Sequence, residues 1–182
     1  MEGLSFVLRK WIGVHFWEKE GKLYRINEYT FIFREKYFKP NLGGFKIMAF
    51  EDFKVGMKAS TSKTITETDV ILFAGVSTDI NPVHLDEETA KKGIFGKRVA
   101  HGILVSGLIS AVLGNKLPGP GSIYMGQELK FLAPVFIGDT ITAEVEIIEL
   151  IPEKCRIKLN TVCRNQDGKT VISGTALIMN RG

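Results

Sequence analysis

The stretch 102–117, GILVSGLISAVLGNKL, decides the fold because it is apolar on nearly every side. It carries no charge before Lys116, and Pro118 follows it at once. A helix that is hydrophobic all round is typical of a protein's interior, and proline cannot continue a helix. The sequence therefore predicts one long, buried helix that ends near Leu117.

Strand-like segments lie on both sides of this helix. One precedes it at 58–65, and others follow it at 122–131, 140–151, 154–165 and 170–179. The segment 140–151 alternates apolar side chains with Thr and Glu, which indicates an antiparallel sheet with one buried face. That face needs a cover, and the central helix is apolar enough to supply it. We therefore predict an α+β domain of the hot-dog fold, in which an antiparallel β-sheet wraps around a long buried central helix.

Two shorter helices are predicted between the first strand and the central helix. The first begins at Thr66, where Asp69 completes a capping box in place of the more usual Glu. The second runs from Asp86 to Lys92, with acidic residues at its start and basic residues at its end, as the helix dipole favours. Because Pro82 cannot continue the first helix, residues 79–84 (DINPVH) are predicted to form a loop.

The first 47 residues differ in composition from the rest. They hold 11 of the 18 aromatic residues and show no steady period, although 24–33 could pair as a strand. Met48 opens the regular pattern, and Gly43-Gly44 lies where glycine codons can spell a ribosome-binding sequence. We expect an N-terminal extension of doubtful origin at 1–47, translated from upstream DNA before a native start at Met48, and a compact domain at 48–182. The alternative is a genuine extension that packs on the domain or on a partner, and the intact mass of the native protein distinguishes the two.

Charge and composition argue against several classes of protein. The net charge of +4 arises in residues 1–47, while residues 48–182 hold 15 basic and 15 acidic side chains, so no nucleic-acid partner is expected. No apolar run reaches the roughly 18 residues of a membrane span, and Arg9 and Lys10 interrupt what would be a secretory signal. Cys155 and Cys163 lie in one predicted strand, about 26 Å apart and too far for a disulfide. We expect a cytoplasmic protein with reduced thiols.

Asp79 and His84 are the strongest candidates for chemistry, because a loop held by rigid helices can turn both side chains toward one cavity. A carboxylate and an imidazole placed there can hold one water between them. The carboxylate can take a proton as the water attacks, and an imidazole, which ordinarily titrates near neutral pH, can return one. Asn81 and Pro82 would fix the loop. The alternative is ordinary turn chemistry, in which Asp and Asn stabilise a helix end and His84 caps or packs.

Further candidates lie at and along the central helix: His101, Gly102 and Ser110. The first N–H groups of a helix lack internal partners and carry partial positive charge. An amide at Gly102 could therefore stabilise an oxygen that becomes negative during a reaction. In the alternative interpretation, Gly102 serves packing, His101 is a satisfied half-buried histidine, and the Ser110 hydroxyl bonds back to the helix backbone.

Three motifs together carry a resemblance to a known family. The segments 79–84 (DINPVH), 100–102 (AHG) and 131–140 (FLAPVFIGDT) have the order and spacing of the MaoC-like hydratases. The chain resembles the (R)-specific enoyl-CoA hydratases with a single hot-dog domain, and the similarity runs from about Phe50 to Met179. Residues 1–47 have no counterpart in this pattern.

The resemblance implies a reaction and a role for each candidate. The reaction would be the reversible syn addition of water to a trans-2-enoyl-CoA, giving the (R)-3-hydroxyacyl-CoA. Asp79 would activate the water, His84 would orient it and supply or relay the proton to the α-carbon, and the Gly102 amide would hold the thioester oxygen. The supporting positions would be Asn81, His101 and Ser110. No metal or redox cofactor is implied, because the thioester itself acidifies the α-carbon, and similar proteins are homodimers.

Three alternatives use the same fold. An (R)-3-hydroxyacyl-ACP dehydratase would act on an acidic carrier protein. Four basic residues near the proposed site either bind that partner or the CoA phosphates, or simply form a solvated helix end: Lys91, Lys92, Lys97 and Arg98. A hot-dog thioesterase generally relies on a carboxylate from the central helix, but 102–117 contains no Asp or Glu. The third alternative is a non-catalytic module that binds acyl thioesters.

Overall fold

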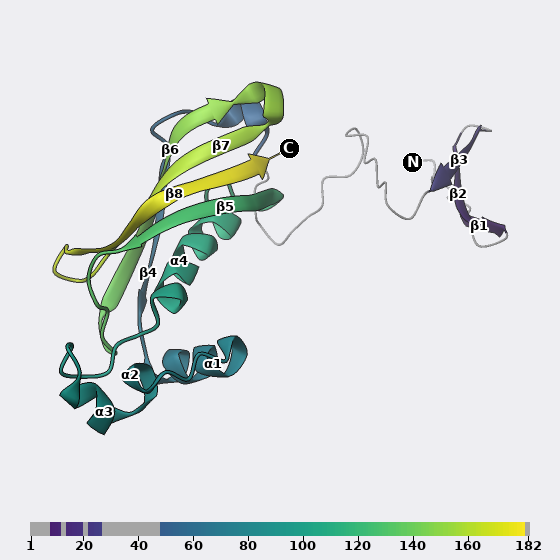
Figure 1. Ribbon diagram of the computed structural model, residues 1–182. Helices are drawn as coiled ribbons and strands as arrows, with labels where there is room; N and C mark the ends of the chain where they lie inside the picture. The colour runs from purple at the N-terminus through teal and green to yellow at the C-terminus, as the bar shows by residue number, and fades with distance from the viewer. Residues whose placement is uncertain (1–7, 12–13, 20–21, 27–47, 181–182) are drawn as a thin grey trace, which may run out of the picture. The chain divides into compact units, whose positions relative to one another are not determined.

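The computed structural model describes residues 8–11, 14–19, 22–26 and 48–180 (Figure 1). The chain divides into two compact units, Met1–Asn41 and Leu42–Gly182. The first unit contains an antiparallel sheet of three short strands, β1 (Leu8–Trp11), β2 (Val14–Lys19) and β3 (Lys22–Ile26). The sequence pointed to a strand only within 24–33, and β3 covers the start of that run. The native start at Met48 stays a prediction.

The second unit is built on one antiparallel sheet, as predicted. Its strands lie in the order β4-β6-β7-β8-β5, so the strand before the central helix and the strand after it form the two edges. The strands are β4 (Lys58–Thr64), β5 (Ser122–Phe131), β6 (Thr140–Ile151), β7 (Arg156–Arg164) and β8 (Thr170–Asn180). Two short 3-10 helices, η1 (Phe50–Asp52) and η2 (Pro152–Lys154), complete this unit together with its α-helices. The predicted α+β hot-dog class is confirmed.

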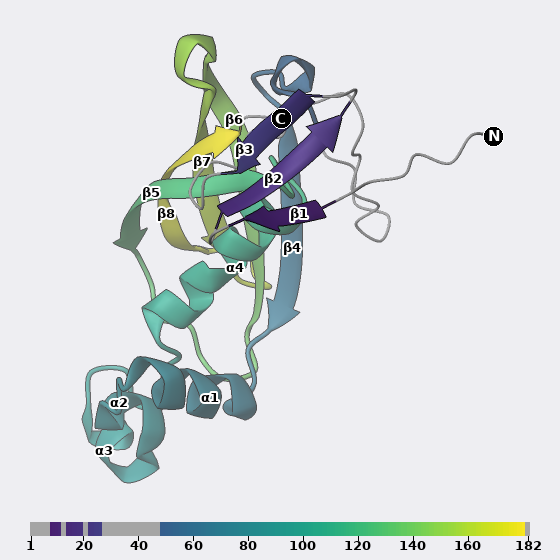
Figure 2. The same cartoon turned by 90° about the vertical axis from the view of Figure 1, so that its right-hand side faces the viewer.

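Helix α4 (Gly102–Asn115) lies across one face of this sheet and forms the centre of the domain (Figures 1 and 2). Its buried side chains meet the apolar face of β6 in one continuous core. The buried members of the two elements are Val105, Ile109, Val112 and Leu113 on α4 and Ile141, Ala143, Val145 and Ile147 on β6. The prediction that α4 is buried on every side is wrong for the single chain, because Ile103 is 57% exposed and Gly107 and Ser110 are also exposed.

Three helices gather at one end of the sheet, beside the start of α4 (Figure 1). They are α1 (Glu67–Ser77), α2 (Pro82–Leu85) and α3 (Glu87–Lys92). The predicted capping box of α1 is confirmed, because the Asp69 amide donates to the Thr66 hydroxyl over 3.2 Å and the Thr66 amide donates to the Asp69 carboxylate over 2.9 Å.

The predicted loop at 79–84 is only half correct, because Pro82 starts the short helix α2. The Asn81 side chain accepts a hydrogen bond from the Val83 amide over 3.2 Å and caps this helix. Proline suits the first position of a helix, where its missing N–H costs nothing. Pro82 therefore both prevents α1 from continuing and opens the next helix.

Two features of the described residues concern the cysteines and the lengths of the helices. Both Cys155 and Cys163 are free thiols. Within residues 48–180 and the three N-terminal strands, no helix combines the length and the apolar character that crossing a membrane requires.

Candidate active site

Asp79 lies in the tight turn that follows α1. Thr78 ends that helix in the left-handed conformation, with φ of 61°, and turns the chain sharply. The Asp79 amide donates to the Ser77 hydroxyl over 3.2 Å, and one Asp79 carboxylate oxygen accepts from the Asn81 amide over 3.3 Å. The turn fixes the direction of the carboxylate while the residue itself stays exposed.

His84 stands on α2, and a backbone carbonyl fixes its ring. Its Nδ1 lies 2.8 Å from the Val99 carbonyl oxygen. Because a carbonyl oxygen only accepts, Nδ1 must carry the hydrogen. Nε2 is then the nitrogen that remains for chemistry.

His101 contacts both of these residues. It is 2% exposed, and its Nε2 donates to the Asp79 carbonyl oxygen over 2.9 Å. Its ring stacks on His84 with centroids 3.8 Å apart and planes 29° apart, and Phe73 lies against it at 4.9 Å. His101 thus touches the backbone of one candidate and the ring of the other. Within the described residues, its Nδ1 has no hydrogen-bond partner.

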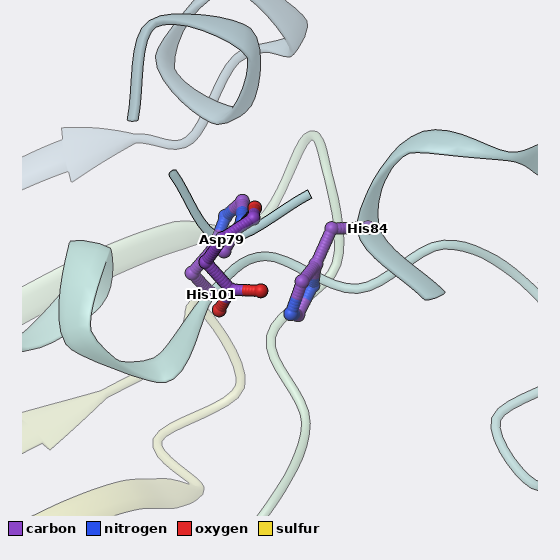
Figure 3. Close-up of side chains that lie close together, drawn as sticks. All are labelled: Asp79, His84 and His101. Atoms are coloured by element: carbon purple, nitrogen blue, oxygen red, sulfur yellow. Dashed lines mark hydrogen bonds between the residues drawn. The ribbon is translucent and has the colours of Figure 1, made fainter. Parts of the chain in front are cut away.

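The three side chains converge, as Figure 3 shows. One carboxylate oxygen of Asp79 and one nitrogen from each of His84 and His101 all lie within 4.8 Å of one another. Such a set can also bind metal ions. However, the two rings are stacked nearly parallel, so their in-plane lone pairs do not point to a common centre. The geometry therefore fits the handling of a proton and a water better than metal coordination.

An open cavity of about 460 Å³ adjoins this cluster. Its wall is mainly apolar and includes Phe95, Ile103, Phe131 and Leu132, as suits the acyl part of a ligand. His84 belongs both to this wall and to the cluster. An apolar ligand in this cavity would lie directly beside an imidazole.

The start of α4 forms another part of the same wall, through Gly102 and Ile103. No side chain among the described residues caps this helix end, so its first N–H groups are available to a ligand. A Cβ at position 102 would lie 2.7 Å from Cε1 of Phe131, so glycine is the residue that fits there. The absence of a side chain at position 102 lets the Phe131 ring pack directly against the start of α4.

The structure brings most of the candidates from the sequence together. Asp79, Asn81, His84, His101 and Gly102 share one region, and Asn81 caps the helix that carries His84. Ser110 is exposed on α4 and is not part of the cavity wall. The roles assigned to these residues stay predictions.

Sequence reasoning did not identify two contacts that shape the site. Phe131 covers Gly102, and the Val99 carbonyl holds the His84 ring. Neither residue type signals chemistry by itself, because an apolar side chain and a backbone carbonyl gain their roles only from folding. The position of Phe131 at the start of the motif 131–140 was the available hint.

Comparison with known proteins agrees with this architecture. Residues 52–168 match the family described as MaoC like domain. An (R)-specific enoyl-CoA hydratase of Rhodospirillum rubrum is 54% identical over 71% of this chain and 90% of its own length. A 3-hydroxybutyryl-CoA dehydratase of Methylorubrum extorquens is 47% identical over 73% of this chain and 84% of its own length.

A solved structure supports the same grouping. The (R)-hydratase of A. caviae involved in PHA biosynthesis superposes with a TM-score of 0.70 at 42% identity, covering 71% of this chain and 98% of the other. The match to the family model spans more than half of the chain and includes every motif of the site. The chain therefore belongs to the family of MaoC-like domains.

Proposed function

We propose that this protein is an (R)-specific enoyl-CoA hydratase, which adds water reversibly to trans-2-enoyl-CoA to give (R)-3-hydroxyacyl-CoA. One observation carries the proposal. Asp79 and His84 converge within 4.8 Å beside an apolar cavity whose wall also includes the uncapped start of α4 at Gly102. Relatives with 42–54% identity that are named as (R)-specific enoyl-CoA hydratases support the same reaction.

The geometry suggests how the water is added. The water donates hydrogen bonds to the Asp79 carboxylate and to Nε2 of His84, the nitrogen left free by the bond from Nδ1 to Val99. Its oxygen bonds to C3 while the electron pair of the C2=C3 bond moves to C2 and the thioester oxygen. That oxygen gains negative charge, which the Gly102 amide stabilises. Asp79 takes the proton that leaves the water, and His84 relays it to C2 on the same face. No metal or redox cofactor takes part in these steps.

The carrier of the acyl group is CoA in this proposal. Of the four basic residues near the site, two already hold acidic partners: Lys91 contacts Glu88 at 2.8 Å, and Arg98 contacts Glu67 and Glu87. This neutralisation does not favour an acidic carrier protein. The measurement is kcat/KM on crotonyl-CoA against crotonyl-ACP, and a higher value on the carrier protein would favour the dehydratase alternative.

The thioesterase alternative has less support. Helix α4 contains no Asp or Glu, so it lacks the carboxylate on which hot-dog thioesterases generally rely. Release of free thiol from acyl-CoA would revive this alternative. A non-catalytic binding module would show no turnover of either kind.

The decisive experiment follows the loss of enoyl thioester absorbance when crotonyl-CoA is added. In Asp79→Asn and His84→Ala, we expect kcat to fall by at least about 10²-fold, as positioned acid and base groups usually contribute. Asp52→Asn, at an exposed carboxylate of η1, is the matched control and should retain the wild-type rate. Near-normal rates in both site variants would remove Asp79 and His84 from the mechanism.

A homodimer is part of the proposal. The edge strand β5 exposes Ile123, Tyr124 and Met125, and α4 exposes Ile103. Pairing of two β5 edges would cover such groups and satisfy the backbone groups of that edge strand. Light scattering should give twice the chain mass of 20.3 kDa, and a stable monomer at micromolar concentration would contradict it.

The free thiols support a cytoplasmic location, which cell fractionation tests.

A further inference from the structure

Arg98 joins two helices that lie on either side of the Asp79–His84 turn. Its guanidinium binds Glu67 through two parallel hydrogen bonds, Nη1 to Oε1 over 2.8 Å and Nη2 to Oε2 over 2.6 Å. Its Nε donates to Glu87 over 3.1 Å. Glu67 is the first residue of α1 and Glu87 the first of α3. The Arg98 side chain is only 19% exposed and is already paired, so it is poorly accessible to the phosphates of a CoA substrate.

The residues after Arg98 continue this support to the site. Val99 donates its amide to the Val83 carbonyl over 3.2 Å and accepts from Nδ1 of His84 over 2.8 Å. Ala100 donates to the Val135 carbonyl over 2.8 Å. His101 then donates to the Asp79 carbonyl and stacks under His84. Segment 98–101 therefore contacts both ends of α1. Arg98 binds the first residue of that helix, and His101 binds the turn that follows its last residue.

We infer that Arg98 is a positioning residue that acts through Val99 on His84. The inference rests on the proposed function only for its kinetic consequence. By anchoring segment 98–101 to α1 and α3, the guanidinium keeps the Val99 carbonyl where it holds the hydrogen on Nδ1 of His84. That hydrogen leaves Nε2 of His84 free for the water. A planar fork with two parallel bonds fixes such a segment better than the single point charge of lysine.

The test compares Arg98→Met and Arg98→Lys with the wild-type protein in kinetics and in imidazole NMR. In Arg98→Met, kcat on crotonyl-CoA should fall about tenfold or more with KM within about twofold, because small displacements of catalytic groups are costly. Long-range proton–nitrogen spectra report which ring nitrogen carries the hydrogen, and the chain has only 3 histidines to assign. The wild type should show His84 with its hydrogen on Nδ1, whereas Arg98→Met should show a mixture of both tautomers. Arg98→Lys should recover part of both effects.

Two further variants keep the result interpretable. Arg164→Met, which removes an exposed ion pair with Glu144 at 3.9 Å, is the matched control and should match the wild type in both readouts. If Arg98→Met does not fold, Glu67→Gln removes one charge of the pair and should shift His84 in the same direction.

Each remaining outcome decides the question. A rise in KM with unchanged kcat would make Arg98 a substrate ligand and overturn the inference. An unchanged tautomer in a folded variant, with or without a lower melting temperature, would reduce Arg98 to a structural ion pair. If the wild type does not hydrate crotonyl-CoA, the proposed function fails, while the tautomer of His84 still tests Arg98.

Discussion

At the scale of single residues, the contact between Gly102 and Phe131 is the tightest constraint on the site. Three ring atoms of Phe131 lie within 3.3 Å of where a Cβ at position 102 would stand. Phe131 is 52% exposed and ends an edge strand, so its ring has room to move outward. The ring contact by itself therefore does not distinguish a glycine kept for packing from one kept for access of a ligand to the amide.

Gly102→Ala should lower kcat on crotonyl-CoA by about tenfold or more, because the added methyl group obstructs the amide that stabilises the thioester oxygen. The double variant Gly102→Ala/Phe131→Ala distinguishes obstruction of the amide from displacement of the Phe131 ring. The double variant removes the clash with the ring and should still be slow, since the methyl group stays in front of the amide. Full recovery in the double variant would mean that the displaced ring, and not the obstructed amide, causes the loss.

At the scale of elements, two features hold the strands and helices that carry the site. Strands β5 and β8 approach so closely at Gly174 that a Cβ there would lie 1.9 Å from the Glu128 carbonyl oxygen. Among the helices, the pair between Arg98 and Glu67 holds α1. The first is a steric constraint on the sheet, and the second is an electrostatic one on the helices.

Gly174→Ala should lower the free energy of unfolding by about 2 kcal/mol or more, the usual effect of overpacking. The backbone carbonyl cannot turn aside as a flexible side chain can. Gly126→Ala is the matched control in the paired strand, because a Cβ there would meet no atom within 4 Å. Denaturant unfolding measures both variants, and equal midpoints would contradict the steric explanation.

The ion pair at the start of α1 makes stability depend on acid. The hydrogen bond from Arg98, which outweighs partial burial, holds the pKa of Glu67 below its ordinary 4.5. The folded pKa lies below the unfolded one, so this contribution is complete above about pH 4.5 and is lost as the pH falls through the folded pKa. Between about pH 5 and about pH 3, the melting temperature of Glu67→Gln should therefore fall less than that of the wild type. If the melting temperatures of the two proteins fall equally with pH, the ion pair does not have this effect.

At the scale of the whole molecule, the core of the domain isolates the buried face of the sheet from solvent. Cys163 on β7 is fully buried in this core, and burial raises the pKa of its thiol to about 12. Cys155 lies between η2 and β7 and is half-buried. The two thiols therefore report on different parts of the same fold.

Cys163 should react with a thiol reagent at pH 8 only when the domain opens, since a thiolate is the reactive form. Cys155 should be labelled first, and Cys163 should follow at a rate that rises with mild denaturant. Mass spectrometry of digested samples distinguishes the two sites, with Cys155→Ser as the control. Equal labelling of both thiols in the native protein would show that the core is not closed around β7.

The sequence by itself determined the elements and their order. An apolar run at 102–117, alternating strands and a capping box at Thr66 are local signals, and each formed the element it predicted. The fold class followed because an apolar sheet face and an apolar helix have to cover each other. Asp79, His84 and Gly102 stood out for a related reason, since they belong to short motifs at turns and helix ends.

The tertiary structure decided what no local pattern contains. Helix α2 formed where Pro82 predicted only a loop, because Asn81 supplied the cap. One face of α4 stayed exposed in the single chain, although the helix is apolar all round. Arg98, a basic surface residue in the sequence, became the link between α1 and α3. The physical reason is that a side chain's partner across space depends on how distant segments pack, and sequence spacing does not record that distance.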